Sequence, residues 1–174
     1  MALDRDTLGI VIADVSDKGA PAAIFMAVAR SLIRGAAIAT VTPTATLRQA
    51  NLSILHDTES GMFVTVYYAI LHAGGRLTGV NAGHNRPLLY HAADETLEFL
   101  PRGGRPLGWF EDLPVHAVEY RLGAGDVLVL YTDGLTEAED ELGQPYGEDR
   151  LAAQVRQHAG RRAFEIRDAI MQDL

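Results

Sequence analysis

The chain has 174 residues and no cysteine, which excludes disulfide bonds and thiolate metal ligands. Any bound metal ion must therefore be held by oxygen or imidazole groups. The chain is also poor in positive charge, because 15 Lys and Arg face 23 Asp and Glu and leave a net charge of -8. Nucleic-acid binding needs a basic face for the phosphates, so this balance argues against a nucleic-acid partner.

Long apolar runs are missing as well. No stretch reaches the roughly 18 apolar residues that a membrane span needs, so no membrane segment is expected. The first residues, MALDRDTLG, have neither the basic start nor the apolar core of a signal peptide. A chain without cysteine is compatible with a reducing cytoplasm, where we expect this protein. Repeats, low-complexity tracts and linkers are absent, so the length predicts one domain, residues 1–174.

What the chain does contain is a clear order of predicted elements. The apolar run at residues 8–13 predicts a strand buried on both faces, and residues 22–37 predict a helix that is apolar nearly all round and well buried. A second helix is expected from Thr42–Pro43 to about residue 57. The later part predicts hairpins of 62–72 with 76–82 and of 87–92 with 96–101, strands at 115–122 and 126–132, and helices after residue 148 and over 164–174. Hairpin-joined strands with grouped helices indicate an α+β fold with a mostly antiparallel sheet.

Two aspartates, Asp14 and Asp133, each come at the end of an apolar strand. A buried carboxylate is costly unless it is paired or bound to a metal ion. Two carboxylates that converge repel each other unless a cation lies between them, and Mg²⁺ and Mn²⁺ prefer such oxygen ligands. The competing interpretation is that both aspartates cap the turns or helices that follow them, since Asp133 and Gly134 form a common turn pair.

Further candidates lie close to these aspartates or follow another strand. Lys18 and Gly19 precede a proline-led helix and could bind an anion there, although the favoured interpretation of Lys18 is a solvated loop residue. In NAGHN, residues 81–85, His84 is a candidate acid or phosphate ligand and equally a hydrogen-bonded turn residue. Asp17 is interpreted as a loop residue.

The aromatic residues are expected to pack in the core. This holds for Phe63, Tyr67 and Tyr68 on the predicted strand, and for Trp109 as a packing anchor after the turn in GRPLGW. The acidic run at 136–143 is expected to be a solvated loop or helix start. Motifs for serine hydrolases, Walker-type nucleotide binding, zinc proteases and dinucleotide binding are absent.

Four segments in order resemble one family: ADVSDKGAPAAIFMA, GMFVTVYYAIL, NAGHNRPLL and GDVLVLYTDGLTEA. They are similar to the bacterial PPM phosphatases, which are related to protein phosphatase 2C, and more narrowly to the stage II sporulation protein E type. PYGEDRL resembles the helix start that follows the last motif in this family. The resemblance covers most of the chain.

The resemblance implies a β-sandwich of mostly antiparallel sheets flanked by helices, in α-β-β-α layers. It also implies hydrolysis of phosphoserine or phosphothreonine by water that is activated between two Mn²⁺ or Mg²⁺ ions, with no catalytic nucleophile from the protein. By similarity, Asp14 would bridge the metals, Val15 would offer its backbone carbonyl and Asp133 would bind one metal. Residues that would lie near substrate or behind the ligands are Lys18, Gly19, Asn81, His84 and Gly134.

The resemblance further implies a phosphorylated anti-anti-sigma protein of the STAS-like type as substrate, in bacterial sigma-factor control. A homodimer is compatible with the sequence. The family's N-terminal acidic motif and its C-terminal DD-x-T motif are not found, and Asp168 and Asp173 fall in a helical pattern instead. We therefore expect a domain truncated at both ends that lacks at least one metal ligand. Two other functions stay open, a non-catalytic sigma-regulatory interaction module and a small-molecule phosphohydrolase.

Overall fold

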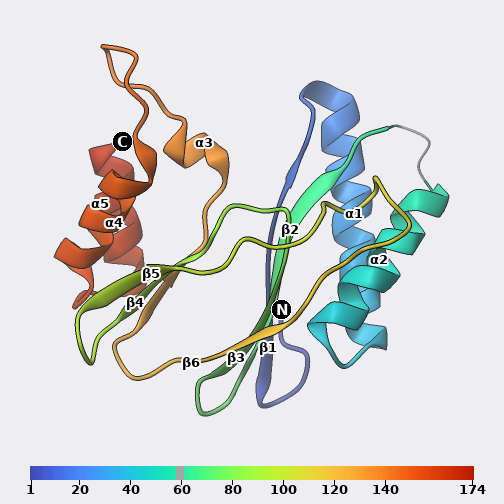
Figure 1. Cartoon of the computed structure of the whole chain (residues 1–174), viewed down its shortest axis with the longest axis horizontal. Coiled ribbons are helices and arrows are strands. Elements are labelled where there is room, and N and C mark those ends of the chain that lie inside the picture. Colours follow the sequence, from blue (N-terminus) through green and yellow to red (C-terminus); the bar gives the residue numbers. More distant parts are fainter. Residues whose placement is uncertain (58–60) are drawn as a thin grey trace. The chain divides into compact units, whose positions relative to one another are not determined.

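The computed structural model describes residues 1–57 and 61–174, and its strands and helices follow the predicted order. Within this part of the chain the elements are β1 (Thr7–Val15), α1 (Gly19–Ala39), α2 (Pro43–Asp57), β2 (Val64–His72), β3 (Arg76–Ala82), β4 (Leu88–His91), β5 (Thr96–Phe99), β6 (Val118–Arg121), β7 (Val127–Val129), α3 (Asp133–Thr136), α4 (Gly147–His158) and α5 (Ala163–Asp173) (Figure 1). They form two compact units. Unit 1 comprises Met1–His84 and Pro101–Arg121, and unit 2 comprises Asn85–Leu100 and Leu122–Leu174. The single domain over residues 1–174 stays a prediction.

Unit 1 is built on a four-stranded antiparallel sheet in the order β1-β2-β3-β6. The β2–β3 hairpin is confirmed, with Tyr67 and Tyr68 buried as expected. Gly79 on β3 makes room for Tyr67, because a Cβ atom there would lie 2.3 Å from the Tyr67 hydroxyl. Alternate residues of β2, among them Val64 and Val66, join α1 and α2 in one hydrophobic core. The helices therefore cover one face of this sheet.

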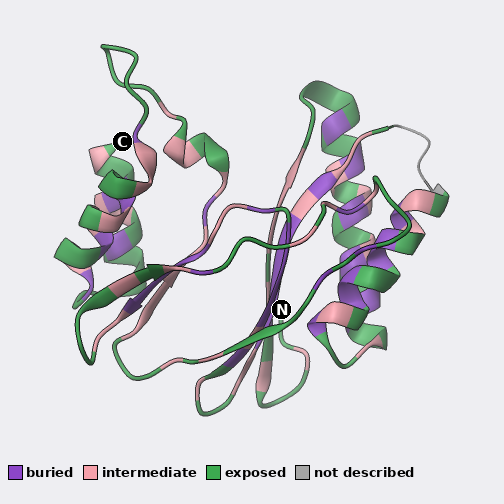
Figure 2. Ribbon diagram, viewed as in Figure 1, coloured by how far each residue is buried: buried purple, intermediate pink, exposed green. Residues whose placement is uncertain are grey.

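Helix α1 is buried along one side only, so the prediction that it is well buried nearly all round is wrong. Its buried residues form one stripe, from Ala22 through Phe25, Ala29 and Ile33 to Ala37, whereas Ile24 is 66% and Ile38 is 76% exposed. Figure 2 shows buried and exposed residues side by side along this helix. Its 21 residues, with a mean hydropathy of 1.6, are by length and composition sufficient to cross a membrane, so the prediction that no stretch of the chain reaches that length is wrong. Here the buried stripe packs in the core of unit 1.

Strand β1 lies at the edge of its sheet and pairs with β2 alone among the described strands. Leu8 is 44% and Val11 is 49% exposed, so the prediction of a strand buried on both faces is wrong. An apolar run without alternation does not distinguish a central strand from an edge strand, because burial depends on which other strands are present. The strand also continues further than predicted and includes Asp14 and Val15.

Unit 2 holds a three-stranded antiparallel sheet in the order β5-β4-β7, whose core also contains residues of α4 and α5. The predicted β4–β5 hairpin is confirmed. Strand β7 is only half-buried and ends at Val129, so the predicted buried strand over 126–132 is too long. Its partner β4 begins at Leu88 after Pro87, and a proline has no N–H to extend the ladder. In unit 1, strand β6 begins at Val118 and not at Val115 as predicted. The Val115 N–H donates instead to the Leu113 carbonyl in a turn.

Candidate functional site

Asp14 lies within β1, directly opposite Thr65 of β2. Opposite residues of an antiparallel pair project to the same face of the sheet, and neighbours along a strand project to opposite faces. Val64 and Val66 face the core under α1 and α2. Thr65 and Asp14 therefore lie on the face of the sheet that the helices leave uncovered.

The carboxylate of Asp14 is partly buried, and its Oδ1 accepts a hydrogen bond of 2.9 Å from the N–H of Val15. It does not cap α1. The N-cap position is held by Lys18, whose side chain makes no capping hydrogen bond. The capping interpretation is therefore wrong for Asp14, and the residue offers carboxylate oxygen at the exposed end of a rigid ladder.

Behind Asp14, two buried or partly buried polar residues form a hydrogen-bonded chain. The Thr65 hydroxyl donates to the Asp14 carbonyl oxygen at 3.3 Å and lies 2.9 Å from His84 Nδ1. Thr65 thus bridges the Asp14 carbonyl oxygen and the His84 ring, and this bridge holds the imidazole in orientation whichever atom of the Thr65–His84 pair carries the shared proton. Thr65 had no signal in the sequence; it is identified only by its pairing with Asp14.

The NAGHN segment is a buried turn closed by its own asparagine. Asn81 accepts a hydrogen bond of 2.8 Å from the His84 N–H and donates one of 3.1 Å to the His84 carbonyl. His84 is 6% exposed and Asn81 is 7% exposed. Gly83 has a φ of 76°, in the region that favours glycine. Of the two interpretations of His84, the geometry supports the hydrogen-bonded turn residue, now connected to Asp14 through Thr65.

The residues after β1 are solvent-facing. Asp17 and Lys18 are exposed, and Asp17 Oδ1 accepts a hydrogen bond from the Lys18 N–H, so the loop interpretation of Asp17 is confirmed. Gly19 begins α1 with a φ of 82°, a conformation that other residues rarely adopt. Anion binding by Lys18 and Gly19 stays a prediction.

Asp133 belongs to unit 2 and is exposed at the start of the four-residue helix α3. Its carbonyl, rather than its carboxylate, accepts the hydrogen bonds that close this turn, from the N–H of Glu137 and the hydroxyl of Thr136. Asp133 and Gly134 thus do form a turn, as one interpretation predicted, but the turn is closed by the Asp133 backbone. The exposed Asp133 carboxylate makes none of these bonds. The acidic run that follows is largely exposed, as expected.

Asp14 and Asp133 lie in different units, so their convergence on a metal stays a prediction. Among residues 1–57 and 61–174 no group of three or more His, Asp or Glu side chains could by itself hold a metal ion. The donor chemistry does fit Mg²⁺ or Mn²⁺, because the carboxylates of Asp14 and Asp133 and the carbonyl of Val15 are all hard oxygen ligands. Asp173, in contrast, bonds Arg150 within unit 2.

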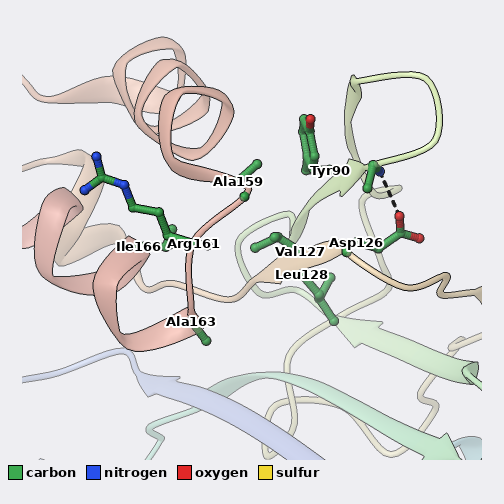
Figure 3. A pocket seen from close by; sticks show the side chains of 11 residues that line it. Tyr90, Asp126, Val127, Leu128, Ala159, Arg161, Ala163 and Ile166 are labelled. Carbon is green, nitrogen blue, oxygen red and sulfur yellow. Dashed lines mark hydrogen bonds between the residues drawn. The ribbon is translucent and has the colours of Figure 1, made fainter.

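A pocket of about 380 Å³ in unit 2 has none of these candidates in its lining (Figure 3). Most of its lining is apolar, including Tyr90, Val127 and Ile166. Its acid, Asp126, accepts hydrogen bonds of 2.8 Å from the N–H groups of Ala92 and Gly123. These hydrogen bonds lower the pKa of Asp126 below its ordinary value, and the bond from Gly123 has the larger effect. Asp126, whose Oδ2 also lies 3.8 Å from His91 Nδ1, therefore fastens a turn.

Near the end of β1, Phe63 and Trp109 depart from the prediction. Trp109 is 56% exposed and is not a core anchor; Leu107, fully buried, is the residue that packs inward. Phe63 precedes β2 instead of lying in it, and its ring stacks on Trp109 at 4.7 Å between centroids. The sequence motif GRPLGW does not reveal which of its two large apolar residues turns inward.

Comparison with known proteins agrees with these segments. The family model described as Stage II sporulation protein E (SpoIIE) matches residues 4–174. The phosphoserine phosphatase RsbU of Bacillus subtilis (strain 168) is 30% identical over 141 residues, which cover 80% of this chain and 42% of RsbU. The chain thus spans less than half the length of this relative.

Solved structures share the fold. The RsbU and RsbW domains of Rv1364c from Mycobacterium tuberculosis align with a TM-score of 0.83 at 27% identity, covering 97% of this chain and 49% of that one. The SiaA-PP2C domain of Pseudomonas aeruginosa gives a TM-score of 0.84 at 22% identity, covering 98% of this chain and 69% of that one. The expected fold, an α+β protein phosphatase 2C-like arrangement of antiparallel sheets and helices, is confirmed.

Proposed function

The chain belongs to the stage II sporulation protein E family, and from this premise we propose that it is a phosphoprotein phosphatase domain. Its proposed reaction is hydrolysis of phosphoserine or phosphothreonine on a regulatory protein of the anti-anti-sigma type, in the bacterial cytoplasm. The observation that carries the proposal is Asp14, held at the end of β1 with its carboxylate on the face that the helices leave open. The RsbU match, to a protein named as a phosphoserine phosphatase, supports the same chemistry.

In this proposal the metal ligands from this chain are the carboxylate of Asp14, the carbonyl of Val15 and the carboxylate of Asp133. Bound Mg²⁺ or Mn²⁺ supplies Lewis acidity, which lowers the pKa of an attacking water and neutralises charge on the phosphoryl oxygens. The protein's own contribution is to hold its oxygens in place. The N–H of Val15 fixes one oxygen of Asp14, and Thr65 with His84 fixes the backbone behind it.

Turnover of para-nitrophenyl phosphate in Mn²⁺, with Asp14→Asn, Asp133→Asn and the control Asp17→Asn, tests the proposal. Loss of a carboxylate ligand removes several kcal/mol of charge stabilisation, or at least about 100-fold in kcat/KM. Asp17→Asn should keep the wild-type rate because Asp17 bonds only its own loop. Equal rates for all four proteins would exclude Asp14 and Asp133 as ligands.

A second function, a non-catalytic module that binds a sigma-regulatory partner, is favoured by one observation. No described group of three acids or histidines could hold a metal by itself. The same assay separates the two functions when run beside a pull-down of a phosphorylated STAS-like protein. Partner binding without any turnover, unaffected by Asp14→Asn, would favour the module.

A further inference from the structure

The exposed Trp109 and Phe110, the half-buried Phe63 and the exposed Arg105 form one continuous surface in unit 1, called here the aromatic surface. The Phe63 and Trp109 rings stack at 4.7 Å with planes 3° apart, and the Trp109 and Phe110 rings lie 5.4 Å apart. The Arg105 guanidinium lies over the Phe110 ring, 4.6 Å from its centroid. Trp109 is 56% and Phe110 is 41% exposed. Isolated exposed apolar residues are common, but a stacked row ended by a guanidinium is not.

The aromatic surface is held rigidly from beneath. Asn51 of α2 is fully buried, donates hydrogen bonds to the Phe110 and Glu111 carbonyls, and accepts one of 2.9 Å from the Gly108 N–H. Gly108 has a φ of 86°, and a Cβ atom there would lie 2.9 Å from Ile54. These contacts leave the loop one conformation, and that conformation directs Trp109 outward. A rigid exposed aromatic side chain binds a partner at little entropic cost.

The same surface is fastened to the candidate site. Ser16, the residue after Val15, donates its N–H to the Phe63 carbonyl at 3.0 Å, and its hydroxyl accepts from the Phe63 N–H at 3.2 Å. Val15 itself pairs with Val64. Phe63, the first of the stacked rings, is therefore bonded to Ser16, the residue directly after the proposed ligands Asp14 and Val15. Any protein segment that presents a phosphate to Asp14 and Val15 lies close to these rings.

The charge on the surface is compatible with this occupant. The chain has a net charge of -8, and the charged group of the aromatic surface itself is Arg105, with Arg102 before it and the exposed acids Glu111 and Asp112 directly after Phe110. Both arginines are exposed. The Arg105 guanidinium can pair with negative charge on a segment that carries phosphoserine. The hydrogen-bonded connection of Phe63 to Ser16, next to Asp14 and Val15, assigns the surface to the substrate instead of a second copy of the chain.

We propose that the aromatic surface binds the part of a phosphoprotein substrate next to its phosphoserine. Apolar side chains of that segment pack on Trp109 and Phe63, and the segment's negative charge faces Arg105. This inference rests on the proposed phosphatase function and adds the feature that selects a protein over a small ester. Trp109 is thus a specificity residue, which does not touch the reacting atoms.

Trp109→Ala tests this, with Phe164→Ala as the control because Phe164 is a comparably exposed aromatic residue of unit 2, at 51%. Substrates are para-nitrophenyl phosphate and two phosphoserine peptides. One peptide has leucine and the other serine about two to four positions from the phosphoserine, since an extended chain covers about 3.3 Å per residue. A tryptophan anchor of at least about 2 kcal/mol predicts about a 30-fold loss of kcat/KM on the leucine peptide, carried by KM. Turnover of para-nitrophenyl phosphate should stay within about twofold.

A matching loss on para-nitrophenyl phosphate, no loss on any substrate, or the same loss in Phe164→Ala would overturn the inference. A wild-type dimer that becomes monomeric in Trp109→Ala by sedimentation would also overturn it, because a second copy would then occupy the surface. If the wild type hydrolyses nothing, the phosphatase proposal fails, and peptide binding still tests the aromatic surface.

Trp109 is the sole tryptophan of the chain, so its fluorescence reports binding at this surface. With EDTA present, its emission should shift to the blue with the leucine peptide and not with the serine peptide; no shift with either would contradict the inference.

Discussion

Asp14 and Asp133 follow similar apolar runs in the sequence but lie in different surroundings. Asp14 is inside a strand, partly buried, with hydrogen bonds to its carboxylate and to its carbonyl. Asp133 is exposed at the start of a four-residue helix, and only its backbone is used to close the turn. The comparison indicates that unit 1 holds its proposed ligand in a prepared position, while unit 2 presents an acid whose placement depends on the turn alone.

The two units also fasten their loops differently. Unit 1 uses the neutral Asn51 to hold the loop of the aromatic surface, and unit 2 uses the charged Asp126 to hold the turn between β6 and β7. The neutral amide of Asn51 makes its hydrogen bonds at any pH at which the protein folds. The carboxylate of Asp126 accepts both of its backbone hydrogen bonds at full strength only when it is ionised. At low pH we therefore expect the loop held by Asn51 to keep its conformation, and the turn held by Asp126 to lose part of its stabilisation.

The largest effect on stability is expected from Asn51→Ala. The substitution removes three hydrogen bonds at a fully buried position and leaves the Gly108 N–H and two carbonyls without their partner. Buried polar groups that lose their partners predict a loss of about 3 kcal/mol in the free energy of unfolding. Urea denaturation measures it. Gln49→Ala, at an exposed position of the same helix, should stay within about 0.5 kcal/mol, and a similarly small loss for Asn51→Ala would show that the loop is not clamped.

Asp126→Asn should cost unit 2 about 2 kcal/mol at pH 7, because two charge-assisted hydrogen bonds to backbone N–H groups are weakened. The pKa of Asp126 is lowered in the folded protein, chiefly by the Gly123 N–H. Its stabilisation is thus fully present above the ordinary Asp pKa of about 3.9 and is lost as the pH falls through the lowered folded value.

Urea titrations of the wild type and Asp126→Asn from pH 7 to pH 3 measure this dependence. The gap between the two proteins should narrow below about pH 4. Glu141→Gln, an exposed acid of unit 2, is the control and should show no gap. A gap that is independent of pH would contradict the role given to the charge.

Thr65→Val sharpens the comparison between the two aspartates. Valine keeps the shape of threonine but removes the hydroxyl that links the Asp14 carbonyl to His84. Groups that orient a metal ligand contribute about 10-fold or more to metal affinity, so the Mn²⁺ affinity should fall by about 10-fold. Thr65→Ser retains the hydroxyl and should restore the affinity. Wild-type affinity in Thr65→Val would show that the hydroxyl has no positioning role.

The order of elements and both hairpins could be predicted from the sequence, because they depend on local periodicity and turn residues. Burial could not be predicted equally well. Leu8 and Ile24 are apolar and exposed, since the sequence does not reveal that β1 is an edge strand or that α1 packs with one face. Trp109 is predicted to pack inward and is exposed, whereas Leu107 packs inward, with the left-handed Gly108 between them.

The candidate site was predictable as residues and only partly as geometry. Asp14, His84 and Asn81 could be selected from motifs, but their connection could not, because it runs through Thr65, a residue with no sequence signal of its own. The structure brings these four together in unit 1. Asp133 and Gly134 belong to unit 2, and their meeting with Asp14 stays a prediction.

Titration calorimetry with Mn²⁺ tests the central claim most directly, because it measures ligand binding without requiring turnover. The wild type should bind Mn²⁺, and Asp14→Asn should lose at least about 100-fold in affinity, since one of few charged oxygen ligands is removed. Asp17→Asn, three residues away and exposed, should bind as the wild type does. Identical isotherms for the wild type and Asp14→Asn would contradict the assignment of Asp14 as a metal ligand and the phosphatase mechanism built on it.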